Sequence, residues 1–158
     1  MSILSLFLWL ENTSLGLALQ RSTWGVAIGE MVHLLALAAL GGTILLVDLR
    51  LFGIGLKRQT ASSLAHELSP IFWSSLAVLL VSGVVILSSE SEKCYYNPAF
   101  RAKMLLLFFA VLFHCTFHRT AVASATEKVP SVRSKSAAAL SLALWLGVGL
   151  AGRAIGYL

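Results

Sequence analysis

The chain has 158 residues, of which 58% are hydrophobic and only 12% are charged. A typical soluble domain carries about 25% charged residues, so this composition excludes a soluble globular domain, a disordered chain and a secreted disulfide scaffold. It predicts a single integral membrane domain over residues 1–158. The net charge of +5 comes from Lys and Arg in short loops between apolar segments, so we expect contacts with the lipid bilayer and not with nucleic acid.

The chain begins with an apolar stretch that is too short to span a bilayer. Residues 2–10 are almost wholly apolar, and polar residues at 11–14 interrupt them. A transmembrane helix needs about 20 apolar residues. We therefore predict a short interfacial helix within about residues 2–20.

Four longer apolar segments follow, each with the length of a membrane span. The predicted spans cover about residues 24–47, 68–87, 99–123 and 137–158. Pro70 falls in the first turn of the second span, and Asn97–Pro98 is a start signal for the third. No segment shows the periodicity of a strand. The predicted fold is an all-α, four-helix, up-and-down membrane bundle.

The distribution of basic residues predicts the orientation. Four spans place both termini on one side of the membrane. The loops at 48–67 and 119–136 carry seven Lys and Arg residues, and the opposite side carries five. The positive-inside rule then places both termini outside, on the side of the membrane away from the cytoplasm.

Ionisable residues of the first span share one face of the helix. At 100° per residue, Glu30, His33 and Asp48 fall on one stripe within roughly 60°, together with Gly41. Ionisable side chains are costly in lipid and are candidates for function. We expect this stripe to face the bundle interior, a cofactor or water.

Histidines in the first and third spans form the main candidate site. His33 lies about 14 Å along the helix from Trp24, and His114 lies about 15 Å from Met104. These spans run in the same direction, so His33 is expected to lie level with His114, or with His118 one turn deeper. Two level imidazoles can be the axial ligands of a haem iron. The leading hypothesis is a b-type cytochrome-like protein that binds haem b, transfers electrons and meets a redox partner.

Charged residues near the termini suggest further contacts. Arg153, Arg101 or Lys103 is a candidate for holding haem propionates. Arg153 is also expected to form an intramembrane ion pair with Glu30, which we interpret as structural. His66, just before the second span, is expected to be an interfacial residue.

Two alternative functions stay open at this stage. In one, His33, His114 and His118 handle copper or another metal ion, with sulfur ligands from Met31, Met104 or Cys115. In the other, the chain is a cofactor-free structural or assembly subunit.

Two further features concern association and catalysis. Glycines at 149, 152 and 156 share one face of the fourth span and suggest close helix packing or a homodimer. No Ser or Cys stands beside a base in a pattern typical of nucleophilic catalysis, so we do not expect an enzyme acting by itself.

Short runs along nearly the whole chain also indicate a family. They are Trp9–Glu11, His33, Val47–Gly53, Pro70 with Trp73, Asn97–Met104 and Phe117–His118. On these runs the chain resembles a family of small bacterial four-helix membrane proteins of unassigned function. That family is distantly similar to two-haem membrane cytochromes and copper-resistance membrane proteins. The resemblance implies a bacterial inner membrane, with both termini in the periplasm. It also implies a haem or metal role and favours His118 over His114, although the fourth span lacks the His of a two-haem pattern.

Overall fold

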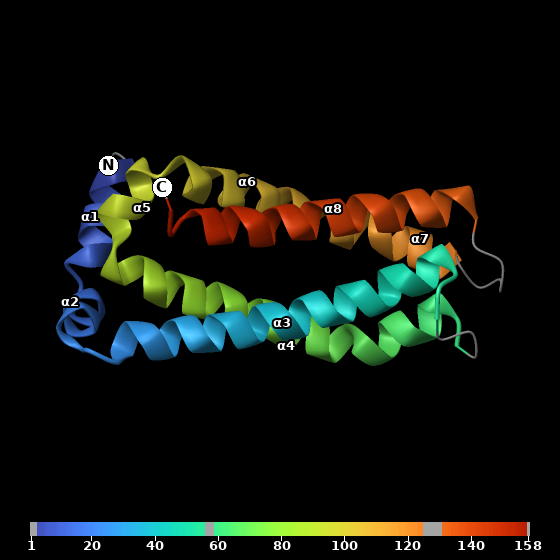
Figure 1. Ribbon diagram of the computed structural model, residues 1–158, viewed down its shortest axis with the longest axis horizontal. Coiled ribbons are helices and arrows are strands. Elements are labelled where there is room, and N and C mark those ends of the chain that lie inside the picture. Colours follow the sequence, from blue (N-terminus) through green and yellow to red (C-terminus); the bar gives the residue numbers. More distant parts are fainter. Residues whose placement is uncertain (1–2, 56–58, 125–130, 158) are drawn as a thin grey trace.

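The computed structural model is a bundle of four long antiparallel helices with both termini at one end (Figure 1). It describes residues 3–55, 59–124 and 131–157, and this part of the chain contains no strand. The first, second and fourth spans are α3 (Gly25–Phe52), α4 (Ala61–Ser89) and α8 (Val132–Ala154). The third consists of α6 (Pro98–Phe113), the π-helix η1 (His114–His118) and α7 (Arg119–Ser124). All four are long and apolar enough to cross a membrane, which confirms the predicted fold of a multi-pass membrane protein.

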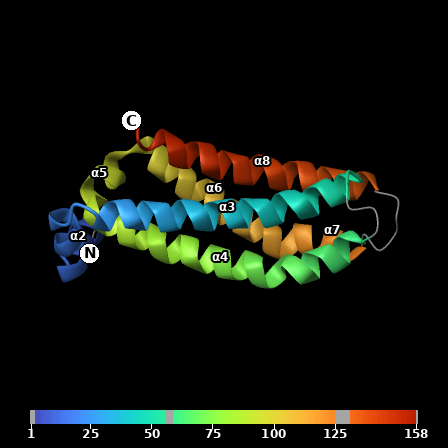
Figure 2. The ribbon, with the colours of Figure 1, turned by 60° about the horizontal axis from the view of Figure 1, so that its bottom comes forward.

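Three short helices close the end of the bundle that carries the termini (Figures 1 and 2). They are α1 (Ile3–Glu11), α2 (Ser14–Arg21) and α5 (Ser91–Tyr96). The predicted interfacial helix is thus two helices, because Thr13 accepts a hydrogen bond from the Gly16 N–H and starts a new one. A Cβ at Gly16 would lie 2.7 Å from the Ser88 carbonyl oxygen, so glycine allows α2 to approach α4 closely.

Two hydrogen bonds tie these terminal helices to the bundle. Gln20 Nε2 donates to the Ser89 carbonyl at 3.1 Å, and the Glu92 N–H donates to Glu11 Oε2 at 2.9 Å. They anchor α1 and α2 to the end of α4 and the start of α5.

The second span begins earlier than predicted. Thr60 caps α4 by accepting from the Ser63 N–H at 3.1 Å, and the helix continues without a break to Ser89. Pro70 therefore lies inside the helix and not in its first turn, which corrects the prediction. The polar residues among 62–67 lower the local hydropathy, so the sequence analysis did not extend the second span over them. They do not prevent a helix from continuing beyond the lipid.

The predicted start of the third span is confirmed. Asn97 Oδ1 accepts from the backbone N–H groups of Ala99 and Phe100, and Pro98 follows it in the first turn. Asn97 Nδ2 also donates to the Ile155 carbonyl at 3.2 Å. This one side chain both caps α6 and fixes it to the end of α8.

The packed core lies between α3, α4 and α8 and continues to α6 (Figure 2). Its members include Leu40, which has no exposed surface, and the buried aromatics Phe72 and Trp145. Because α3 contacts α4 and α8 while α6 contacts α8, α3 and α6 are diagonal. Many other large apolar side chains point outward, as a helix surface in contact with lipid requires.

We expect Leu40→Ala to destabilise the bundle by about 2 kcal/mol or more, because it leaves a cavity in packed surroundings. Leu35→Ala is the matched control, since Leu35 is 65% exposed on the same helix. Reversible unfolding in mixed detergent measures both free energies. Equal losses for the two variants would contradict this assignment of the core.

Candidate functional site

A buried hydrogen bond joins the first and third spans at the end of the bundle opposite to the termini. His118 Nε2 lies 2.7 Å from Asp48 Oδ1, and the two side chains are 3% and 0% exposed. A carboxylate accepts hydrogen bonds, so Nε2 carries the proton and donates it. Nδ1 of a neutral His118 then keeps its lone pair.

The π-helix η1 determines how the two histidines of the third span are presented. The Arg119 N–H donates to the His114 carbonyl, five residues back, in place of the α-helical pattern. The His114 and His118 rings stack with centroids 5.0 Å apart, and Phe72 of α4 stacks on His114 with centroids 4.0 Å apart. This continuous stack of three rings fixes the plane of the His114 imidazole.

The stack borders a cavity of about 220 Å³ between α3, α4 and the η1–α7 segment. Its lining combines three imidazoles with apolar, hydroxyl and basic side chains: Thr43, Ile44, Val47, Ser62, Ala65, His66, Leu68, Ser69, Phe72, Trp73, His114, His118, Arg119 and Val122. One water needs roughly 10–15 Å³ of such volume. The cavity has room for an ion with several waters or for a small molecule.

Unsatisfied polar atoms concentrate around this buried pair. Among the described residues, Asp48 Oδ2, His114 Nδ1 and Ser141 Oγ are the buried side-chain atoms that make no hydrogen bond. Ser141 of α8 nevertheless lies close enough to Asp48 to act on its carboxylate. Buried polar groups are almost always paired in native proteins, so this region can accept a further polar or ionic ligand.

The structure does not bring His33 together with His114 or His118. His33 Nδ1 lies 2.9 Å from Ser82 Oγ in the other half of the bundle. His33 precedes Asp48 by 15 residues, which is about 22 Å along α3. A bis-His haem requires both imidazoles on one iron, so His33 with either partner does not fit that site.

The cause is the residue from which the depth of His114 was counted. Because α6 begins at Pro98, His114 lies about 24 Å along the third span, whereas His33 lies about 12 Å along α3. The sequence prediction counted from Met104 and so placed the two at one depth. Haem binding and electron transfer stay predictions from the sequence alone.

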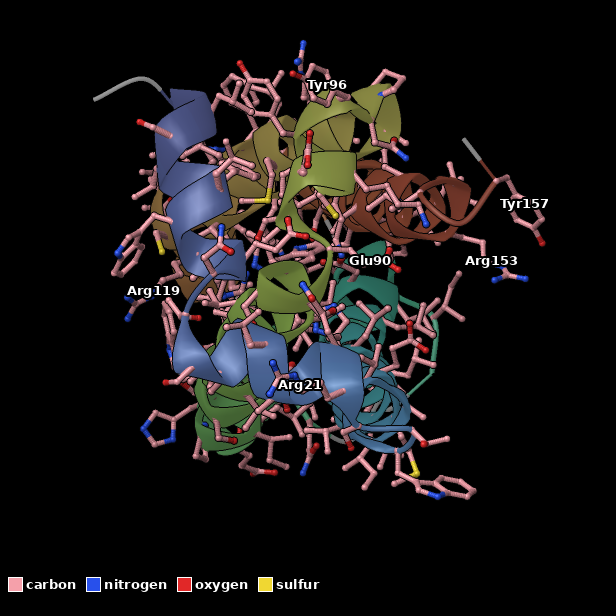
Figure 3. All side chains as sticks on the ribbon, turned by 90° about the vertical axis from the view of Figure 1, so that its left-hand side faces the viewer. Arg21, Glu90, Tyr96, Arg119, Arg153 and Tyr157 are labelled. Carbon is pink, nitrogen blue, oxygen red and sulfur yellow. The ribbon has the colours of Figure 1, made fainter. Side chains whose placement is uncertain are left out.

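The predicted ion pair between Glu30 and Arg153 does not form either. Arg153 Nη2 donates to the Tyr157 hydroxyl at 2.7 Å, and Figure 3 shows Arg153 and Tyr157 pointing away from the bundle. Glu30 is exposed, and no ion pair within the described ranges joins it to Arg153. The predicted stripe on α3 is buried at Asp48 but not at Glu30.

The other charged and sulfur candidates lie outside the cavity that His66, His114 and His118 line, although the charge of Lys103 acts on His33. Arg101 donates to the Tyr95 carbonyl, and Lys103 is half-buried beside Gly152 of α8. Met31, Met104 and Cys115 are exposed, and none lines the cavity. No three His, Cys, Asp or Glu side chains in the described parts of the chain stand in ligand geometry around one point.

Sequence reasoning missed the partner of Asp48 and the place of His66 at this cavity. Asp48 was on the predicted polar stripe, but its partner on the third span could not be identified without the relative depth of the helices. His66 fell outside the predicted second span, because the polar residues at the start of α4 were interpreted as a loop.

Comparisons with known proteins assign a family and no activity. Residues 6–158 match the model of DUF6644, a family of unknown function, and the chain belongs to that family. No curated protein and no solved structure matches. The resemblance to an uncharacterised family is confirmed, and similarity to cytochromes or copper-resistance proteins stays a prediction.

We expect Asp48→Ala to destabilise the protein by about 3–5 kcal/mol, because it leaves His118 buried without its partner. Glu30→Ala is the control, since Glu30 is exposed on the same helix and should change stability by less than about 0.5 kcal/mol. Unfolding in mixed detergent gives both values. An Asp48→Ala cost no larger than the control would show that the pair does not hold α3 to the third span.

Proposed function

We propose that this protein binds a transition-metal ion inside the membrane, through His114 and His118, at the cavity between α3, α4 and the η1–α7 segment. The observation that supports this most is the buried hydrogen bond from His118 Nε2 to Asp48 at 2.7 Å. Metal-ligating imidazoles usually donate their second ring N–H to a carboxylate, which fixes the tautomer and makes the free nitrogen a better ligand.

His114 supplies the second argument. Its Nδ1 is buried and makes no hydrogen bond, while its ring is held by the stack with Phe72 and His118. A metal ion that binds this nitrogen satisfies it in a way that no neighbouring side chain does. Imidazole nitrogen suits zinc, copper, iron and nickel ions.

A cofactor-free structural role explains less of this arrangement. A structural Asp–His pair needs only to join two helices, and it gains nothing from an adjacent cavity with a second imidazole whose nitrogen is unpaired. Ionisable residues in a membrane interior are typically part of an ion or substrate path. Metal-ion handling therefore accounts for Asp48, His118 and His114 together.

The proposal includes an orientation in a bacterial inner membrane. The described residues of the segments 48–67 and 119–136 lie at the end of the bundle that contains the cavity, and Lys57, Arg58 and Lys128 are outside the described residues. The positive-inside rule places this end in the cytoplasm and both termini in the periplasm. The cavity would then exchange ions with the cytoplasmic side.

We expect the detergent-purified protein to bind Zn²⁺ or copper ions, and His118→Ala to weaken binding at least about tenfold. His33→Ala is the matched control and should bind as the unchanged protein does. Equilibrium dialysis with metal analysis measures the affinities. Because His118→Ala strands a buried carboxylate, the double variant Asp48→Asn/His118→Ala is measured as well.

The same preparations separate the competing functions. A Soret band with sharp reduced α and β bands, lost in His33→Ala, would overturn the proposal in favour of haem. A folded, colourless protein that binds no metal would overturn the proposal in favour of a cofactor-free structural or assembly subunit.

Orientation is tested at Cys94, in α5 at the end that carries the termini. A membrane-impermeant maleimide should label it from the periplasm in intact cells, and Cys94→Ser should abolish labelling. Burial and nearby Glu90 raise the pKa of the Cys94 thiol, so labelling should be slow at neutral pH and accelerate as the pH rises and more thiolate forms. If Cys94 is labelled only after the cells are opened, this end of the bundle faces the cytoplasm and the proposed orientation is wrong.

A further inference from the structure

We infer that His66 of α4 is a third ligand, and that the site takes a divalent ion of the zinc or copper(II) class bound by three imidazoles. This inference rests on the proposed function. It adds a ligand from α4, whereas His114 and His118 belong to the third span. It also narrows the proposed ion to the zinc or copper(II) class.

His66 is placed to reach the ion without breaking another interaction. Its side chain lines the same cavity as His114 and His118, yet it is exposed. Across the described part of the chain, no hydrogen bond, ion pair or ring contact holds its imidazole. In the described conformation the three imidazoles do not stand around one point, so His66 has to change rotamer to meet an ion held by His114 and His118. Those two rings are fixed by Asp48 and Phe72.

The helix around His66 lacks one of its backbone hydrogen bonds and offers further polar groups to the cavity. Pro70 lies four residues further along α4 and has no N–H, so the His66 carbonyl lacks its usual helical donor. The hydroxyls of Ser62 and Ser69 line the cavity on the same helix. His66 lies only about 8 Å from the start of α4, so an ion can meet it first on entering from the loop end.

The set of donors decides the class of ion. Three imidazoles with an open fourth position, filled by water, are typical of tetrahedral zinc sites, and copper(II) is also well bound by imidazole. Copper(I) is selected by thiolate and thioether sulfur. Neither Met nor Cys lines this cavity, so nitrogen and water are the ligands it offers.

Arg119 works against this binding and provides an independent test. It lines the cavity from α7, and Figure 3 shows it directed outward from the bundle. Its charge repels an entering cation. Arg119→Gln should therefore tighten Zn²⁺ binding, most clearly at low salt, where charges are least screened.

The main experiment counts nitrogen ligands in the full-length protein in detergent. X-ray absorption with Zn²⁺ and electron paramagnetic resonance with Cu²⁺ should give three imidazoles for the unchanged protein and two for His66→Ala. The Kd should rise at least about tenfold in His66→Ala and stay unchanged in His33→Ala. Added imidazole should restore part of the affinity of His66→Gly.

The outcomes distinguish this inference from the proposed function. If His66→Ala keeps the affinity and ligand count while His114→Ala and His118→Ala lose binding, His66 is not a ligand and the proposed function stands. Sulfur in the ligand shell would overturn the assigned class of ion. Absence of metal binding in the unchanged protein would overturn both.

Discussion

The hydrogen bond between Asp48 and His118 is the interaction on which the arrangement of the site depends. In a membrane, helices gain little from hiding apolar surface from one another, since lipid is equally apolar. A buried ionisable pair acts differently, because either partner alone is costly in that environment. With 0% and 3% of their side chains exposed, Asp48 and His118 fix the depth of the third span relative to the first. The π-helix, the ring stack and the cavity all lie beside this pair.

The bundle separates its histidines and their polar partners into two distant groups. One group is Asp48, His114 and His118, with His66 at the same cavity. The other is His33 with Ser82, nearer the termini. Apolar core residues, among them Leu40 and Leu76, lie between them. A single cofactor held by histidines from both groups is therefore incompatible with this bundle, whereas a compact ion at one end is compatible with it.

The site combines fixed and movable donors, and this combination suits reversible binding. His118 is held by a carboxylate and His114 by stacking with Phe72 and His118, so neither has to be ordered when an ion arrives. His66 is exposed and unconstrained, so it can admit or release an ion. The function of the family is unknown, so the geometry of this site is what indicates an activity.

The sequence by itself determined the class of protein, the number of spans and the start of the third helix, because bilayer thickness and the Asn97 cap are read directly from local residues. It also identified His114 and His118 as candidates, since i and i+4 share a helix face. Only the tertiary structure decided that His118 pairs with Asp48, that His33 lies about 22 Å away, and that Arg153 faces Tyr157 and not Glu30. The physical reason is that hydropathy marks which residues lie in lipid but not how far one helix slides along another. That relative depth is fixed by contacts between side chains distant in the sequence.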